Sequence, residues 1–147
     1  MKRLLVINGA NLNMTGVQNA GGYRSESLDD ICVRVDNEAV DHGFITEFFQ
    51  SNNEADIIDR VHESMLDCEG VIINAGAWSH YSYALRDAIA SVSHHVPFIE
   101  VHMTNIYAGE EFCRTSVIAP VCVGQICGFG SEAYILAVHA MASILYK

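Results

Sequence analysis

Short, almost uninterrupted apolar runs recur along this chain, and longer segments with helical spacing separate most of them. Residues 3–8 and 71–74 are dominated by leucine and β-branched residues. Such runs suit strands that are buried on both faces of a parallel sheet. Residues 44–50, 97–102 and 121–127 predict three further strands. The pattern favours the α/β class, with helices layered on a parallel sheet.

Four helices are expected around these strands: from Leu28 to Gly43, from residues 51–54 to Glu69, from the cap Ser79 to about Val92, and from Ser131 to Leu145. Ser27 is a suitable N-cap for the first helix, and Asp29 and Asp30 fall in its first turn. Five strands cannot close an eight-stranded barrel. We therefore expect one domain over residues 1–147, with an open, doubly wound, flavodoxin-like sheet of order 2-1-3-4-5.

The composition excludes several classes of partner. Eighteen acidic residues against eight basic ones give a formal net charge of -10, which repels nucleic acid and anionic membrane surfaces. No apolar run approaches the ~18 residues of a membrane helix, so we expect no membrane partner and a cytoplasmic location. The five cysteines contain no C-x-x-C pair, which favours free thiols.

Polar residues follow the expected strands at their C-terminal ends, where ligands bind in open α/β sheets. Residues 8–13 form a turn rich in asparagine, but they lack the later glycines of G-x-G-x-x-G and the P-loop pattern. A nucleotide site is therefore disfavoured. The asparagines can hold a water molecule or a polar ring, or can cap turns.

Residues 74–80 leave the third strand and enter the next expected helix, which brings backbone amides and the His80 imidazole together. A cation is disfavoured near a helix N-terminus, so His80 is expected to act as a neutral hydrogen-bonding group. An exposed turn histidine is the alternative interpretation.

Glu100 and His102 share one face of the fourth strand, because side chains alternate along a strand. A carboxylate beside an imidazole orients it and stabilises its protonated form, which suits a general acid. A metal site with His80 and a purely structural pair are the alternatives. We expect no metal, since His94 and His95 lie at the other end of the strand.

A set of motifs spans nearly the whole chain. They are Asn8-Gly9-x-Asn11-Leu12-Asn13, Tyr23, Gln50-Ser51-Asn52, Asn74-Ala75-Gly76-Ala77, His80, Ala84-Leu85-Arg86-Asp87-Ala88, Glu100-Val101-His102-x-x-Asn105-Ile106, Glu110-Glu111-Phe112, Ser116, Ala119-Pro120 and Gly128-Phe129-Gly130. Together they resemble the type II 3-dehydroquinate dehydratase family. The resemblance implies a flavodoxin-like, cofactor-free lyase of the shikimate pathway and aromatic amino acid biosynthesis. It also implies trimers that assemble into dodecamers.

The family's reaction removes water from a cyclic β-hydroxy ketone that carries a carboxylate. By resemblance, Tyr23 would be the base that removes the proton α to the carbonyl. Asn11 and Asn74 would hold the enolate or its bound water. His102, oriented by Glu100, would protonate the departing hydroxyl.

The resemblance also implies how a small, anionic, cyclic substrate would be held. The backbone amides of Met103 and Thr104 would bind its carboxylate, and His80 would bind a ring hydroxyl. Asp87 would reach the site from a neighbouring subunit.

Three arginines of the family are replaced here, by Gln18, Gly109 and Cys113. Free tyrosine has a pKa near ~10, so a tyrosine base needs a cation nearby. Arg24, next to Tyr23, and Arg114, next to Cys113, are the sequence-local candidates. We hypothesise that Arg24 restores the charge, and an exposed loop arginine is the alternative.

The Cys113 position bears on the substrate, because a thiol cannot imitate a guanidinium fork. We expect the aromatic residues Trp78, Tyr81 and Tyr83 to fill the space that the arginine leaves. Three functions stay open: a dehydratase acting on 3-dehydroquinate, a lyase or isomerase acting on another carboxylated ketone, and a silent homologue that binds a metabolite or serves as a scaffold.

Overall fold

The computed structural model describes residues 1–17 and 26–147. They contain a parallel sheet of order β2-β1-β3-β4-β5, which confirms the predicted topology. The strands are β1 (Lys2–Asn8), β2 (Phe44–Gln50), β3 (Gly70–Asn74), β4 (Phe98–His102) and β5 (Gly124–Cys127). The predicted start of the fifth strand at Val121 is wrong. Residues 119–121 form a 3-10 helix that contains Pro120, and proline cannot donate to a sheet ladder.

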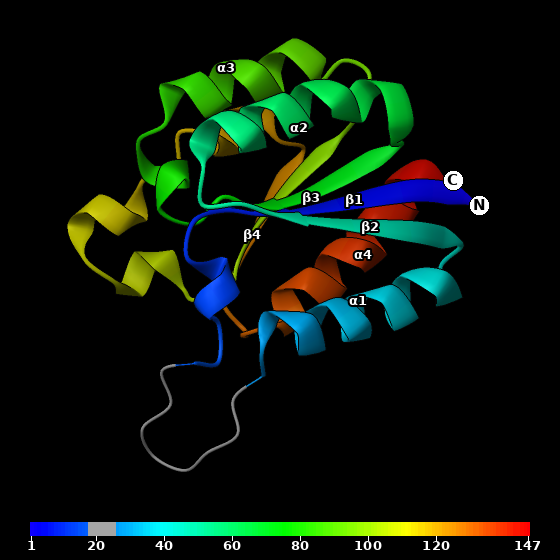
Figure 1. The fold of residues 1–147 in the computed structure, drawn as a ribbon, viewed down its shortest axis with the longest axis horizontal. Coiled ribbons are helices and arrows are strands. Elements are labelled where there is room, and N and C mark those ends of the chain that lie inside the picture. The colour runs from blue at the N-terminus through cyan, green and yellow to red at the C-terminus, as the bar shows by residue number, and fades with distance from the viewer. Residues whose placement is uncertain (18–25) are drawn as a thin grey trace.

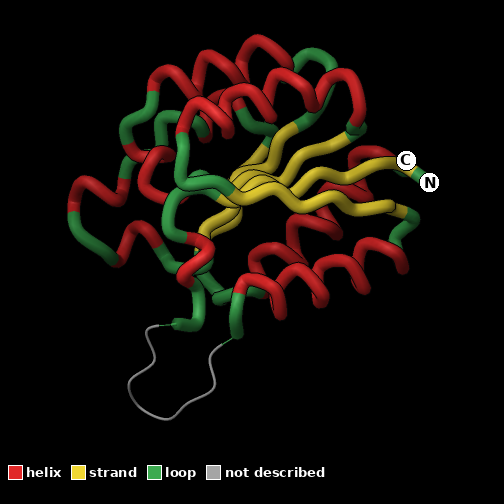
Figure 2. The backbone as a smooth tube through the Cα atoms, viewed as in Figure 1, coloured by secondary structure: helices red, strands yellow, loops and turns green. Residues whose placement is uncertain are grey.

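Four α-helices cover the sheet: α1 (Leu28–Asp41), α2 (Glu54–Asp67), α3 (Tyr83–Val92) and α4 (Glu132–Leu145). Helices α2 and α3 lie on one face, and α1 and α4 lie side by side on the other (Figure 1). The strands form a single layer between them (Figure 2). Among the helices described, none is both long and apolar enough to span a bilayer.

Strand β1 shows why the apolar runs are nearly continuous. Leu5 and Ile7 pack in the core under α2 and α3, whereas Leu4 and Val6 pack in the core under α1 and α4. All four side chains are at most 1% exposed. Burial on both faces removes the polar alternation that a strand with one wet face would show.

Helix caps confirm one prediction and correct another. Ser27 caps α1 in a reciprocal capping box with Asp30. Ser79 does not cap α3, because residues 76–80 form a separate 3-10 helix and the Ser82 side chain accepts from the Leu85 amide instead. His80 therefore ends a 3-10 turn rather than beginning an α-helix.

Candidate active site

A cavity of about 450 Å³ lies beside the C-terminal ends of β3 and β4. It is lined by Leu12, Asn74, Gly76, His80, His102, Met103, Thr104, Asn105, Ile106, Gly109 and Cys113. Strand ends and the loops that follow them supply these residues. Five predicted site residues therefore come together here: Asn74, His80, His102, Met103 and Thr104.

Close approach of the loops after β1 and β3 shapes one wall of this cavity. A side chain at Gly9 would place its Cβ 2.5 Å from the Ala75 carbonyl oxygen. Gly76 has a φ of 61°, and its backbone faces the Ala10 carbonyl and the Leu12 side chain. Glycine is needed at both positions, because one forbids a Cβ and the other has left-handed backbone geometry.

Glu100 and His102 form a buried pair at the end of β4. His102 Nε2 lies 2.5 Å from Glu100 Oε2, and the two residues are 6% and 0% exposed. The bond holds the imidazole ring in one orientation and leaves Nδ1 as the nitrogen free of Glu100. Because His102 also lines the cavity, the pair can deliver a proton there.

Two residues without a predicted role complete the surroundings of Glu100. Ser116 Oγ lies 2.9 and 2.8 Å from the two carboxylate oxygens, and Gln125 Nε2 donates to Oε1 at 3.1 Å. Gln125 pairs with Glu100 in the β4–β5 register. These donors compensate a carboxylate removed from water. Ser116 falls within the family motifs, whereas Gln125 becomes visible only once the register is known.

His80 faces the same cavity and is held by a backbone carbonyl. Its Nδ1 lies 2.8 Å from the Thr115 carbonyl oxygen, so Nδ1 carries a proton and Nε2 is the ring nitrogen left for a ligand. The ring stacks against that of His102, with centroids 6.0 Å apart and an angle of 15°. The stated reason for a neutral His80 is wrong, because His80 ends a 3-10 helix and does not lie at a helix N-terminus.

Asn74 is held by a buried chain of hydrogen bonds. Its Oδ1 accepts from the Gly76 amide at 3.1 Å, and its Nδ2 donates to the Tyr134 hydroxyl at 2.9 Å. Tyr134 in turn donates to Asn8 Oδ1 at 2.5 Å. The orientation of the Asn74 amide at the cavity wall is therefore fixed from α4 and β1.

Tyr134 is a structural donor and not a base. Burial raises the pKa of its hydroxyl above the ordinary tyrosine value, and the hydrogen bond from Asn74 only partly opposes this shift. The phenol keeps its proton at neutral pH and donates it to Asn8. No sequence signal marked Tyr134, which lies in the apolar pattern of α4.

Several predicted residues lie outside the cavity lining. Asn11 is exposed in left-handed backbone geometry, and its amide donates to Asn52 Oδ1 at 2.8 Å. Asp87 is exposed on α3. Arg114 is also exposed, and its Nε donates to the Gly109 carbonyl at 3.2 Å. Gln18, Tyr23 and Arg24 fall outside the described residues.

The expectation that aromatic bulk fills the cavity is wrong. Trp78 packs in the core under α2 and α3, while Tyr81 and Tyr83 are 60% and 68% exposed. None of the three lines the cavity. Cys113 and Gly109 do line it, so this wall is small and has little charge.

The described cavity lining contains no lysine or arginine. Nor do Glu100, His102 and His80 form a metal-ligand cluster, because the compact clusters of the described residues lie elsewhere. Acid–base chemistry is what this arrangement favours.

Comparison with known proteins identifies the family. The model of the family "Dehydroquinase class II" matches residues 2–142. A 3-dehydroquinate dehydratase of Caldicellulosiruptor bescii is 49% identical over 146 residues, which are 99% of each chain. The type II dehydroquinases of Butyrivibrio crossotus and Propionibacterium acnes, solved as crystal structures, both have a TM-score of 0.89. They are 42% and 35% identical, with 97% of each chain covered. This chain belongs to the class II dehydroquinase family.

Proposed function

We propose that this protein is a lyase that dehydrates 3-dehydroquinate to 3-dehydroshikimate. The buried Glu100–His102 pair that opens into the cavity carries the proposal. Loss of hydroxide from carbon is slow unless the leaving oxygen is protonated, and a fixed imidazole is suited to that step. The relatives named as 3-dehydroquinate dehydratases supply the substrate.

The first step is removal of the proton α to the ketone, which leaves an enolate. Family resemblance assigns this step to Tyr23. The oriented Asn74 amide at the cavity wall stabilises the enolate or a water molecule bound to it. His102 then donates its proton to the departing hydroxyl, and the carbon–carbon double bond forms as the carbon–oxygen bond breaks.

Backbone and imidazole groups hold the substrate. The loop of Met103 and Thr104 lines the cavity directly after His102, and its amides bind the substrate carboxylate in this proposal. His80 Nε2 accepts a hydrogen bond from a ring hydroxyl. Asn11, in the loop after β1, helps to hold the enolate or its bound water.

Three arginines of the family are replaced in this chain, so another residue must supply the positive charge beside Tyr23. Arg114 is turned toward the Gly109 carbonyl and does not line the cavity. We therefore assign the compensating charge to Arg24, next to Tyr23 in the chain. Arg24→Ala should reduce kcat far more than Arg114→Ala, and equal effects would overturn this assignment.

We also propose an oligomeric state, a pathway and a cellular location for the enzyme. Asp87 is exposed on α3, and it reaches the cavity of a neighbouring subunit in trimers that form a dodecamer. The enzyme serves the shikimate pathway in the cytoplasm and needs no metal or organic cofactor for catalysis. Multi-angle light scattering measures the assembly directly, and a monomer would exclude the role of Asp87.

The decisive experiment mixes purified protein with 3-dehydroquinate and follows the ultraviolet absorbance of the conjugated enone product. We expect turnover in the wild type and its loss in Tyr23→Phe, with unchanged circular dichroism. A wild type without turnover would exclude this substrate.

One observation favours a second candidate, a lyase or isomerase acting on another carboxylated ketone. The wall at Gly109 and Cys113 offers no guanidinium to substrate hydroxyls, so a less hydroxylated ketone would lose fewer hydrogen bonds there. Turnover of such ketones with a higher kcat/KM than 3-dehydroquinate would support it. Binding of quinate analogues without any turnover would instead indicate a silent homologue.

A further inference from the structure

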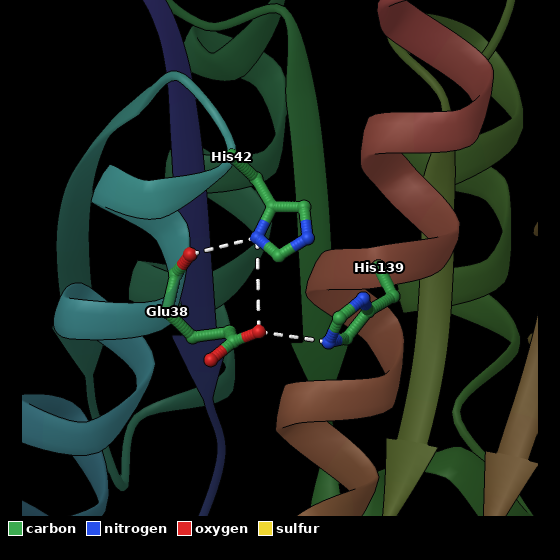
Figure 3. Close-up of side chains that lie close together, drawn as sticks. All are labelled: Glu38, His42 and His139. Atoms are coloured by element: carbon green, nitrogen blue, oxygen red, sulfur yellow. Dashed lines mark hydrogen bonds and ion pairs between the residues drawn. The ribbon is translucent and has the colours of Figure 1, made fainter.

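Away from the cavity, a second group of histidine and carboxylate side chains lies between α1 and α4. Glu38 lies in the last turn of α1, His42 follows the last residue of that helix, and His139 comes from α4 (Figure 3). One donor atom of each residue lies within 4.8 Å of the donor atoms of the other two. We propose that these three residues bind a divalent transition-metal ion of the zinc type.

Contacts with one carboxylate oxygen bring the three side chains together. Glu38 Oε1 lies 2.8 Å from His139 Nε2 and 3.7 Å from His42 Nδ1. The ligand atom of His42 would be its other ring nitrogen, Nε2, because Nδ1 is bonded to the Glu38 backbone carbonyl. The two imidazole rings meet edge to face, with centroids 4.4 Å apart. Ligands of a tetrahedral zinc ion lie roughly 3.3 Å from one another. Side-chain movements of about half an ångström are therefore enough to bring Glu38 and His139 to that spacing.

The proton on His42 is already placed as it is in metal sites. Its Nδ1 lies 2.9 Å from the Glu38 backbone carbonyl oxygen, which requires an N–H there and leaves a lone pair on Nε2. Metal-bound histidines commonly donate their other ring N–H to a backbone carbonyl in this way. Figure 3 shows the His42 ring turned toward His139.

The two helices are held together independently of the metal. Near the start of α4, Arg34 lies 2.9 Å from Glu26 and 2.5 Å from Glu132. The pair with Glu132 joins α1 to α4, and both carboxylates neutralise the guanidinium. Because Asp41 and Glu132 line the adjoining surface cavity with Glu38 and Arg34, acidic groups outnumber the basic group around the site. An incoming cation is therefore attracted.

The donor set selects the kind of ion. Two imidazoles and one carboxylate suit Zn²⁺, Cu²⁺ and Ni²⁺, whereas Mg²⁺ and Ca²⁺ prefer oxygen ligands. His139 is 51% exposed, so solvent can reach the ion and complete its coordination with water. Such an ion would bridge α1 and α4 and stabilise the fold, away from the chemistry of His102.

The test is titration of the full-length protein with Zn²⁺ in a calorimeter, together with thermal unfolding. We expect one equivalent to bind and the unfolding temperature to rise with zinc concentration, because the ion binds the folded chain. His139→Ala and Glu38→Gln should each weaken this binding by about tenfold or more. His62→Ala, which removes an exposed histidine from α2, is the matched control and should bind as the wild type does.

Zinc can also bind cysteine thiols or the imidazoles of His80 and His102. If the strongest equivalent and the thermal shift are the same in wild type and His139→Ala, the ion binds at such a place and the proposal is wrong. Loss of both in His139→Ala, with both retained in His62→Ala, places the ion between α1 and α4.

Discussion

Among the described residues, carboxylate–histidine contacts occur in two different environments. Glu100 and His102 are 0% and 6% exposed, whereas the side chains of Glu38 and His139 are 30% and 51% exposed. The contact distances are similar, at 2.5 and 2.8 Å. What differs is the access of water and the number of additional partners.

Burial determines what each pair can do. Ser116 and Gln125 donate to Glu100, so the carboxylate is satisfied and the ring of His102 is fixed beside the cavity. Around Glu38, one imidazole bonds the carboxylate, the second lies 3.7 Å from the same oxygen, and solvent reaches both. The first arrangement favours directed proton transfer, and the second favours exchange of the bonded proton for a metal ion.

The largest expected effect is on catalysis by the buried pair. His102→Gln keeps an amide that can donate to Glu100 but cannot deliver a proton to the leaving oxygen. We expect kcat to fall by about 10³, within the range for loss of a general acid. Enone absorbance measures this fall, with His139→Gln as the matched variant in the exposed cluster. A similar loss of kcat in both variants would mean that the buried pair has no special role in catalysis compared with the exposed cluster.

A smaller effect is expected from the orienting carboxylate. Glu100→Gln keeps the shape but replaces the carboxylate acceptor of His102 Nε2 by an amide that can also donate, so the orientation of the imidazole is no longer fixed. We expect kcat to fall by about 10², while Glu38→Gln leaves kcat unchanged. An unaltered kcat in Glu100→Gln, with only a lower unfolding temperature, would make the buried pair structural.

The next effect is on stability, at Tyr134 beside the buried site. Tyr134→Phe removes the donor to Asn8 and the acceptor for Asn74. We expect a loss of about 1–3 kcal/mol in the free energy of unfolding. Urea unfolding at a fixed protein concentration measures it. A loss below about 0.5 kcal/mol would contradict the expected cost of unpaired buried amides.

The difference in stability between the wild type and Tyr134→Phe should also depend on pH. In the unfolded chain the Tyr134 hydroxyl ionises near ~10, whereas burial raises its pKa in the folded protein. The stability that comes from the neutral phenol is therefore complete below about pH 10 and is lost as the pH rises further. The difference in stability between wild type and Tyr134→Phe should shrink above that pH. A constant difference up to pH 11 would contradict the role of burial.

Much of this architecture was predictable because it follows from local patterns. Apolar runs and caps predicted the alternating strands and helices, from which the sheet order was inferred, and period-2 alternation placed Glu100 beside His102. The starts of α3 and β5 were missed because Ser79 and Ser82 are equivalent as caps in sequence, and because a short 3-10 turn at Pro120 resembles a strand end.

Contacts between distant segments were not predictable in this way. Gln125 meets Glu100 only through strand register, and Tyr134 reaches Asn8 across 126 residues. The spacing of Glu38 and His42 on one helix face suggests a pair, but the partner His139 depends on how α4 packs against α1. The sheet order does not determine that packing.

The smallest expected effect is on stability in the exposed cluster without added metal. Glu38→Gln removes the charge shared by His42 and His139, but it leaves the backbone carbonyl that binds His42 Nδ1 in place. Exposed ion pairs contribute at most about 1 kcal/mol. We therefore expect a smaller loss than in Tyr134→Phe when both are unfolded in urea with a chelator present. A loss as large as that of Tyr134→Phe would mean that the cluster already ties α1 to α4 without metal, and exposure would then no longer separate the two sites.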